Sequence, residues 1–292
     1  MTLPLGVHTY SYVWDQTFEE TLRHLAALGH TSAEAIVNPP HLWPADLDAE
    51  RRNSIAALMA ETGVRLTSLN CPSLDLNLTA SAREVRTYSL DHYRQVIDLA
   101  ADLGVPAVCA IPGKVHPLLA APLDLLRGWL HDALAALDEH AQRRDVDLLV
   151  ENFPPGFLPL AEDLMAFLDQ PALARVGVVY DVANGAFAGE DPVHGLSVVA
   201  PRLRLVHLSD TGLERYGHDD IGTGIVRFDA VAGALERIGY DGDSVLEVIT
   251  RDAASADTDL RRNVERLERS GWHVPRPPGA GGEPTHSGGG GS

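Results

Sequence analysis

Three carboxylates and one imidazole stand at the ends of four consecutive apolar runs. Glu151, Asp181, His207 and Glu247 each close a short β-branched run, and each is separated from the next by about one strand and one helix. Crowded carboxylates repel one another and hold protons unless a cation neutralises them. Any one of these residues alone would more simply pair with an arginine or cap a helix. Four in succession favour a divalent metal, and ligands without thiolate suit Mn²⁺, Mg²⁺, Co²⁺ or Zn²⁺.

Eight apolar runs alternate with stretches of helical spacing. The runs are Leu5–Tyr12, Ser32–Val37, Arg65–Asn70, Ala107–Ile111, Asp147–Asn152, Gly177–Asp181, Arg204–Leu208 and Ser244–Ile249. Strand–helix repeats joined by short turns require parallel strands with right-handed crossovers, and eight of them close into an α/β (β/α)₈ TIM barrel. A doubly wound open sheet is the alternative, but residues 11–14 lack the Gly-rich loop expected after its first strand.

Local signals place the ends of several helices. Thr17 with Glu20 and Ser81 with Glu84 have the spacing of a capping box, which predicts two helix starts. Glycines 29, 63 and 104 each follow a helical run just before a strand, where glycine commonly ends a helix. The barrel is therefore expected to be one domain over residues 1–274, followed by a flexible Gly/Pro/Ser-rich tail over 275–292.

Charge and composition exclude several classes of partner. The 292 residues include 41 acidic and 23 basic ones, a formal charge of −18, which opposes binding to nucleic acid or an anionic membrane. No apolar run is long enough to span a bilayer, and the start of the chain lacks the layout of a signal peptide, so a cytoplasmic location is expected. Cys71 and Cys109 are interpreted as core thiols.

Several fragments carry a family resemblance. They are Val150-Glu151-Asn152, Tyr180-Asp181-Val182-Ala183-Asn184, Val206-His207-Leu208-Ser209-Asp210, Ile221-Gly222-Thr223-Gly224 and Leu246-Glu247-Val248. Over roughly residues 3–270 the chain resembles the sugar phosphate isomerase/epimerase family, also described as xylose-isomerase-like barrels. The resemblance implies a (β/α)₈ barrel that binds one divalent metal, first of all Mn²⁺, through the same four residues.

The ketose 3-epimerases and inosose-processing members of that family suggest a reaction. The resemblance implies that the metal holds two adjacent substrate oxygens, while Glu151 and Glu247 exchange a proton with a carbon beside the carbonyl. The expected function is therefore isomerisation or epimerisation of a sugar, keto-sugar or cyclitol, a small polyhydroxylated carbonyl compound. A lyase is the alternative, because β-elimination, as in inosose dehydration or C-glycoside cleavage of a 3-keto sugar, begins with the same proton abstraction.

Two further candidates lie on the loop after the fourth run. Lys114, the single lysine, is a candidate for binding an anionic substrate group, and His116 is a candidate general acid or base. A solvent-exposed loop without a specific role is the simpler interpretation of both.

Four more residues are candidates for contact with the substrate. Asn184 stands where many ketose epimerases carry a substrate-binding histidine, and His218 follows the seventh run. Trp14 offers an apolar wall for a sugar ring, although packing explains such a tryptophan equally well. Glu34, at the end of the second run, is interpreted as orienting a loop or a substrate hydroxyl, with a salt bridge as the alternative.

Two other classes of protein share these features less well. Apurinic-site endonucleases use the same barrel, but they need more histidine ligands and a basic DNA track. A metal-free scaffold protein would lack a bound divalent ion altogether. Association into a homo- or hetero-oligomer is expected from the family resemblance.

Overall fold

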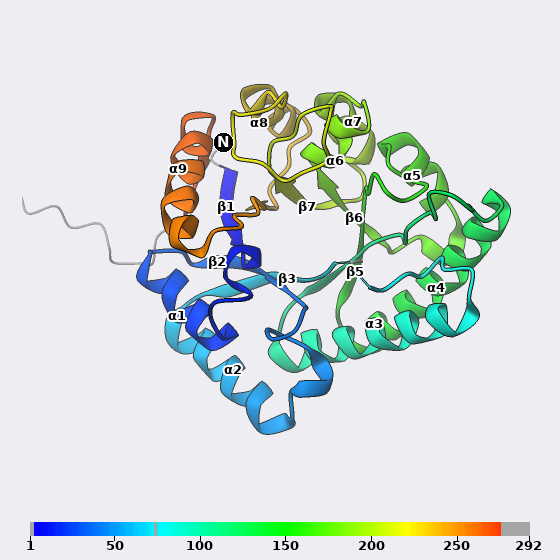
Figure 1. Ribbon diagram of the computed structural model, residues 1–292, viewed down its shortest axis with the longest axis horizontal. Helices are drawn as coiled ribbons and strands as arrows, with labels where there is room; N and C mark the ends of the chain where they lie inside the picture. The colour runs from blue at the N-terminus through cyan, green and yellow to red at the C-terminus, as the bar shows by residue number, and fades with distance from the viewer. Residues whose placement is uncertain (1–2, 73–74, 276–292) are drawn as a thin grey trace, which may run out of the picture.

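Eight parallel strands close into a barrel, with the helices around its outside (Figure 1). The computed structural model describes residues 3–72 and 75–275, so the predicted tail lies outside the described residues except for Pro275. The strands are β1 Leu3–His8, β2 Ser32–Ile36, β3 Arg65–Cys71, β4 Ala107–Ala110, β5 Asp147–Glu151, β6 Gly177–Asp181, β7 Leu203–Leu208 and β8 Asp243–Leu246. The barrel closes because β1 pairs with both β8 and β2. The TIM-barrel prediction is confirmed.

Helices follow the strands in the order that the sequence predicts. They are α1 Phe18–Ala27, α2 Ala49–Thr62, α3 Arg83–Leu103, α4 Leu123–Arg144, α5 Ala161–Leu168, α6 Val182–Phe187, α7 Pro192–Val199, α8 Phe228–Arg237 and α9 Ala256–Arg269. A short strand that was not predicted, β9 (Trp272–His273), pairs with the start of β1. Within the described ranges, no helix is both long and apolar enough to cross a membrane.

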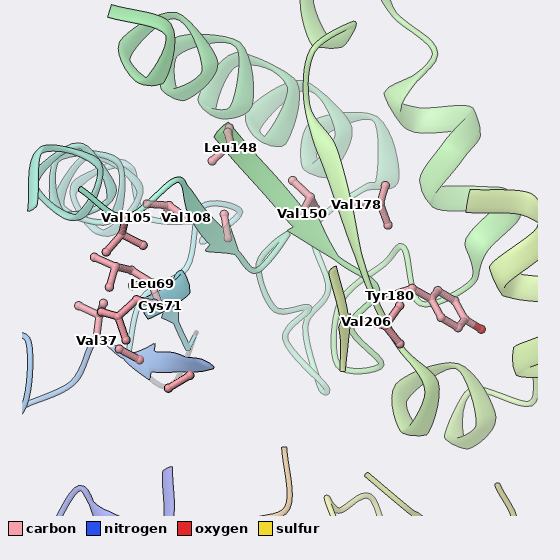
Figure 2. Close-up of a cluster of buried hydrophobic side chains, with 14 of the residues drawn as sticks. Val37, Leu69, Cys71, Val105, Val108, Leu148, Val150, Val178, Tyr180 and Val206 are labelled. Atoms are coloured by element: carbon pink, nitrogen blue, oxygen red, sulfur yellow. The ribbon is translucent and has the colours of Figure 1, made fainter. Parts of the chain in front are cut away.

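Side chains of β4 to β8 alternate between two cores. Leu148 and Val150 of β5 and Val178 of β6 belong to the large core that includes the inner faces of the helices (Figure 2). The intervening positions form a second cluster made only of strand residues, Ala107, Cys109, Leu149, Val179, Leu205 and Val245, which fills the barrel. Because strand side chains have a period of two, the next inward position on each strand faces the end of the barrel interior.

Some local predictions were right and others were wrong. Thr17 and Glu20 form the predicted capping box at α1, whereas α3 starts after Ala82 without any side-chain cap, so the second capping box was wrong. The first strand ends at His8 instead of continuing to Tyr12, because the Tyr10 amide donates to the His8 ring at 3.0 Å and the chain turns into a 3₁₀ helix. Both cysteines are free and buried, as predicted.

Candidate metal centre

Glu151, Asp181, His207 and Glu247 converge at the carboxyl ends of β5 to β8. Each is the inward position that follows a residue of the inner cluster, and Asp181 is the register partner of His207. All four are buried, and each offers one ligand atom within 4.8 Å of the others. The strand ends therefore bring together the set that the sequence predicted, as residues that can hold a metal ion.

Several atoms of this cluster have no hydrogen-bond partner. Asp181 uses Oδ1 to cap α6, accepting from the amides of Ala183 and Asn184, which leaves Oδ2 unpartnered. Glu247 Oε2 and His207 Nδ1 lie 3.0 Å apart, yet neither makes a hydrogen bond. Buried polar atoms without partners are costly. Carboxylate oxygens and an imidazole nitrogen that point into one small space fit a divalent cation.

Burial and charge shift the titration of these groups in opposite directions. Burial raises the pKa of Glu247 to about 7, while the neighbouring His207 and His218 oppose that rise. Burial also raises the pKa of Glu151. Burial alone would lower the pKa of His207, but Glu247 and Glu34 raise it well above its ordinary value. A cation at this point would favour ionised glutamates and an unprotonated Nδ1.

Asn184 and His218, which the sequence suggested as substrate contacts, lie directly against the cluster. Asn184 Nδ2 donates to Glu151 Oε1 at 2.9 Å. His218 Nδ1 lies 3.0 Å from the Ser209 hydroxyl and 3.5 Å from one carboxylate oxygen each of Asp181 and Glu247. Both side chains are therefore placed to touch a ligand held by these carboxylates.

The loop after β7 holds His218 in place through one aspartate. Asp210 accepts hydrogen bonds from the amides of Gly222, Gly224 and Val226 and pairs with Asp219 in a short antiparallel bridge. Because Asp210 binds the backbone of these four residues, the segment that contains His218 has little freedom. The Ile221-Gly222-Thr223-Gly224 fragment thus ties the loop to the Asp210 carboxylate, and these contacts are called the Asp210 clamp below.

The other predicted residues have different surroundings. Glu34 is fully buried, with Oε2 2.8 Å from His207 Nε2 and Oε1 accepting from the Ser68 hydroxyl. Trp14 is 76% exposed. His116 is also exposed, and its Nδ1 accepts from two amides of its own loop. Lys114 is partly buried, and its backbone amide donates to Asn77. The substrate or catalytic roles of these four residues stay predictions.

Three polar residues beside the cluster were not among the candidate site residues predicted from the sequence. Asn70 Nδ2 lies 3.5 Å from Glu247 Oε1, and Asn152 bonds both backbone groups of Asp181. The Tyr216 hydroxyl lies 3.2 Å from His218 Nε2. The strand-end position of Asn70 was a usable signal, since it is the inward residue before Cys71. The position of Tyr216 depends on the loop fold and had no such signal.

An open cavity of about 520 Å³ adjoins the cluster. Its lining residues are Arg215, Tyr216, Gly217, His218, Asp219, Ile249 and Arg251. His218 belongs to this lining and also lies 3.5 Å from the carboxylates of Asp181 and Glu247, so one side chain separates the cavity from the candidate metal centre. Its volume is within the range of small-molecule sites.

The fold and the four-residue cluster together define a TIM barrel with a candidate metal centre at the carboxyl ends of its strands. The chain belongs to the xylose isomerase-like TIM barrel family, whose pattern it matches over residues 22–270. The L-ribulose-5-phosphate 3-epimerase UlaE of Salmonella paratyphi C is 24% identical over 267 residues, which cover 89% of this chain and 92% of that protein.

Solved structures share the same fold. A D-tagatose 3-epimerase-like protein superimposes with a TM-score of 0.76 at 20% identity, covering 91% of this chain and 99% of the other. The IOLI protein, solved with a zinc atom, gives a TM-score of 0.78 at 15% identity and covers 92% and 99% of the two chains. These likenesses agree with the barrel seen here.

Proposed function

We propose that this protein is a divalent-metal-dependent sugar epimerase or isomerase. The observation that carries the proposal is the convergence of Glu151, Asp181, His207 and Glu247 at one buried point, where several of their ligand atoms lack partners. The relatives add support, because a curated protein similar over 89% of the chain is named as a ketose-phosphate 3-epimerase. Mn²⁺ is the ion that we expect first, and the zinc bound to a structural relative supports a divalent site.

Four residues of the chain have separate roles in the proposed reaction. A divalent cation, when bound, polarises a substrate carbonyl and so acidifies the neighbouring C–H bond. Glu151 and Glu247 come from strands that are not neighbours, β5 and β8, and act as the base that removes the proton and the acid that returns it. Asn184 fixes the orientation of Glu151. His218, between the cavity and the carboxylates, orients a substrate hydroxyl.

The proposed substrate is a small ketose, free or phosphorylated. The adjoining cavity suits a pentose or hexose in size, and its lining includes two guanidinium groups, Arg215 and Arg251. Arg215 is paired with Asp219 at the cavity wall. Polar and aromatic groups around a few convergent charges are typical of sugar sites.

The test is a panel of free and 5-phosphorylated ketoses, together with an inosose, incubated in D₂O. Chelated, Mn²⁺-restored and Asp181→Asn protein are compared by mass spectrometry and chiral chromatography. The proposal expects an epimeric or isomeric product that has gained one deuterium, with turnover lost on chelation and in Asp181→Asn. Loss of water from the inosose would instead identify a lyase. Turnover that survives complete chelation would refute the metal requirement.

A further inference from the structure

Glu34 is a buried carboxylate that lies beside the candidate metal centre but outside the four-residue ligand set. It comes from β2, and its side chain has no exposed area. Its Oε2 lies 2.8 Å from His207 Nε2 and 3.5 Å from His8 Nε2, while its Oε1 accepts from the Ser68 hydroxyl at 2.5 Å. A fully buried carboxylate is costly unless charges and donors compensate it. Here the Ser68 hydroxyl donates to Oε1, and the two imidazole rings face Oε2.

The contact between Glu34 and His207 is short, but it is not an aligned hydrogen bond. Glu34 Oε2 and His207 Nε2 are 2.8 Å apart, but their relative directions do not suit a hydrogen bond. Neither atom has another hydrogen-bond partner. The negative charge of Glu34 nevertheless faces the Nε2 edge of the ring. It favours a proton on that nitrogen, and a single proton there leaves the Nδ1 lone pair free on the side of Glu151 and Glu247.

A second metal at His8, Glu34 and Glu247 is the competing interpretation, because these three residues also offer ligand atoms within 4.8 Å of one another. The geometry of His8 opposes it. His8 Nδ1 accepts a hydrogen bond from the Tyr10 amide at 3.0 Å, so the ring proton of a neutral His8 is on Nε2. An Nε2–H that faces Glu34 has no lone pair to offer a cation. His8 therefore faces Glu34 with a ring proton and not with a free nitrogen.

We propose that Glu34 is a positioning residue that fixes His207 with its proton on Nε2 and its Nδ1 directed to the metal. Metal-bound histidines commonly place the other ring nitrogen against a carboxylate, and loss of that partner typically weakens metal binding about 10- to 100-fold. The His8 ring lies against one oxygen of the Glu34 carboxylate, and the Ser68 hydroxyl donates to the other. This inference rests on the metal site proposed above.

The test measures Mn²⁺ binding to metal-free protein by isothermal titration calorimetry. Glu34→Gln keeps the shape but removes the charge, and it is expected to bind Mn²⁺ about 10- to 100-fold more weakly than wild type. Glu190→Gln is the control, since the Glu190 carboxylate also has polar contacts at both oxygens, from the Tyr180 hydroxyl and the Ala161 amide, without touching His207. Its Mn²⁺ affinity is expected to stay within about twofold of wild type.

The position of the proton on the His207 ring is tested by nuclear magnetic resonance. In Zn²⁺-loaded, ¹⁵N-labelled protein, the His207 ring is expected to show a protonated Nε2, assigned by its absence in His207→Asn. Glu34→Gln is expected to shift that resonance, and Glu190→Gln is not. If Glu34→Gln does not fold, Ser68→Ala replaces it, with an expected loss of at least about threefold in affinity because Glu34 loses a donor.

The possible outcomes separate the two proposals. Wild type that binds no metal would overturn both this inference and the proposed function. Wild type that binds one equivalent, with equal affinity in folded Glu34→Gln, would overturn only the role of Glu34. Two equivalents in wild type that fall to one in Glu34→Gln would make Glu34 a ligand itself and would also overturn its positioning role.

Discussion

Asn184 holds Glu151 by a single hydrogen bond inside the barrel mouth. Asn184 Nδ2 donates to Glu151 Oε1 at 2.9 Å and, with the same nitrogen, to the Asn152 carbonyl at 2.9 Å. Cys109 Sγ lies 3.6 Å from the other oxygen, Oε2. Asn184 therefore contacts the proposed base. Its position on α6 next to the Asp181 cap fixes the orientation of that base.

Replacement of Asn184 by alanine is expected to lower kcat on the sugar substrate about 10- to 100-fold. A hydrogen bond to a charged group contributes about 1.5 to 3 kcal/mol, and its loss frees Glu151 to turn away from the substrate carbon. Steady-state kinetics of Asn184→Ala measure the effect, with the exposed Asn53→Ala as control. An unchanged kcat in folded Asn184→Ala would show that Glu151 is positioned by other contacts.

The loop that holds His218 should tolerate alanine at one glycine and not at another. A Cβ on Gly224 would collide with the Thr211 carbonyl and the Asp210 carboxylate, whereas a Cβ on Gly212 would meet nothing within 4 Å. Overpacking of this kind costs about 1 to 3 kcal/mol, and here it displaces the Asp210 clamp. The free energy of unfolding, measured in urea, and kcat are both expected to fall for Gly224→Ala. Both are expected to stay near the wild-type values for Gly212→Ala. Equal behaviour of the two variants would argue against the Asp210 clamp.

His92 should make the protein less stable in acid. The ring stacks on Trp43 at 4.1 Å between centroids, and burial lowers its pKa to about 4. The unfolded chain, with a histidine pKa near about 6.5, binds the proton more readily. The stability due to neutral His92 is therefore complete above about pH 6.5 and is lost as the pH falls toward 4.

Urea unfolding at pH 7.5 and pH 5 measures this effect. The free energy of unfolding is expected to fall less in His92→Phe than in wild type over that interval. His194→Phe, at an exposed histidine of α7, is expected to follow wild type. If His92→Phe loses as much stability in acid as wild type, His92 is not the group that titrates.

The convergence of the four candidate ligands could be predicted because it depends on strand periodicity alone. Each residue lies at or near the end of an apolar run, and parallel strands bring their carboxyl ends to one rim, so chain order determines their proximity. The same periodicity marks Glu34 and Asn70 as inward positions. It could not show that Glu34 lies 2.8 Å from His207, because that contact crosses the barrel between β2 and β7.

The direction of loop side chains is harder to predict from sequence, for a physical reason. His116 and Trp14 were chosen for their chemistry near strand ends, but loops of several residues can direct a side chain toward solvent, as both do here. Tyr216 reaches His218 only because Asp210 ties the loop back on itself. No spacing rule in the sequence encodes that closure.

Exchange of the substrate proton with solvent tests the central claim most directly. Mn²⁺-loaded wild type, Glu151→Gln and Glu247→Gln are incubated with the ketose in D₂O, and both epimerisation and deuterium at the reacting carbon are measured. We expect each variant to epimerise about 10²- to 10⁴-fold more slowly. We also expect the glutamate that remains to exchange that carbon's proton without inverting it. Epimerisation near the wild-type rate in both variants would contradict the account.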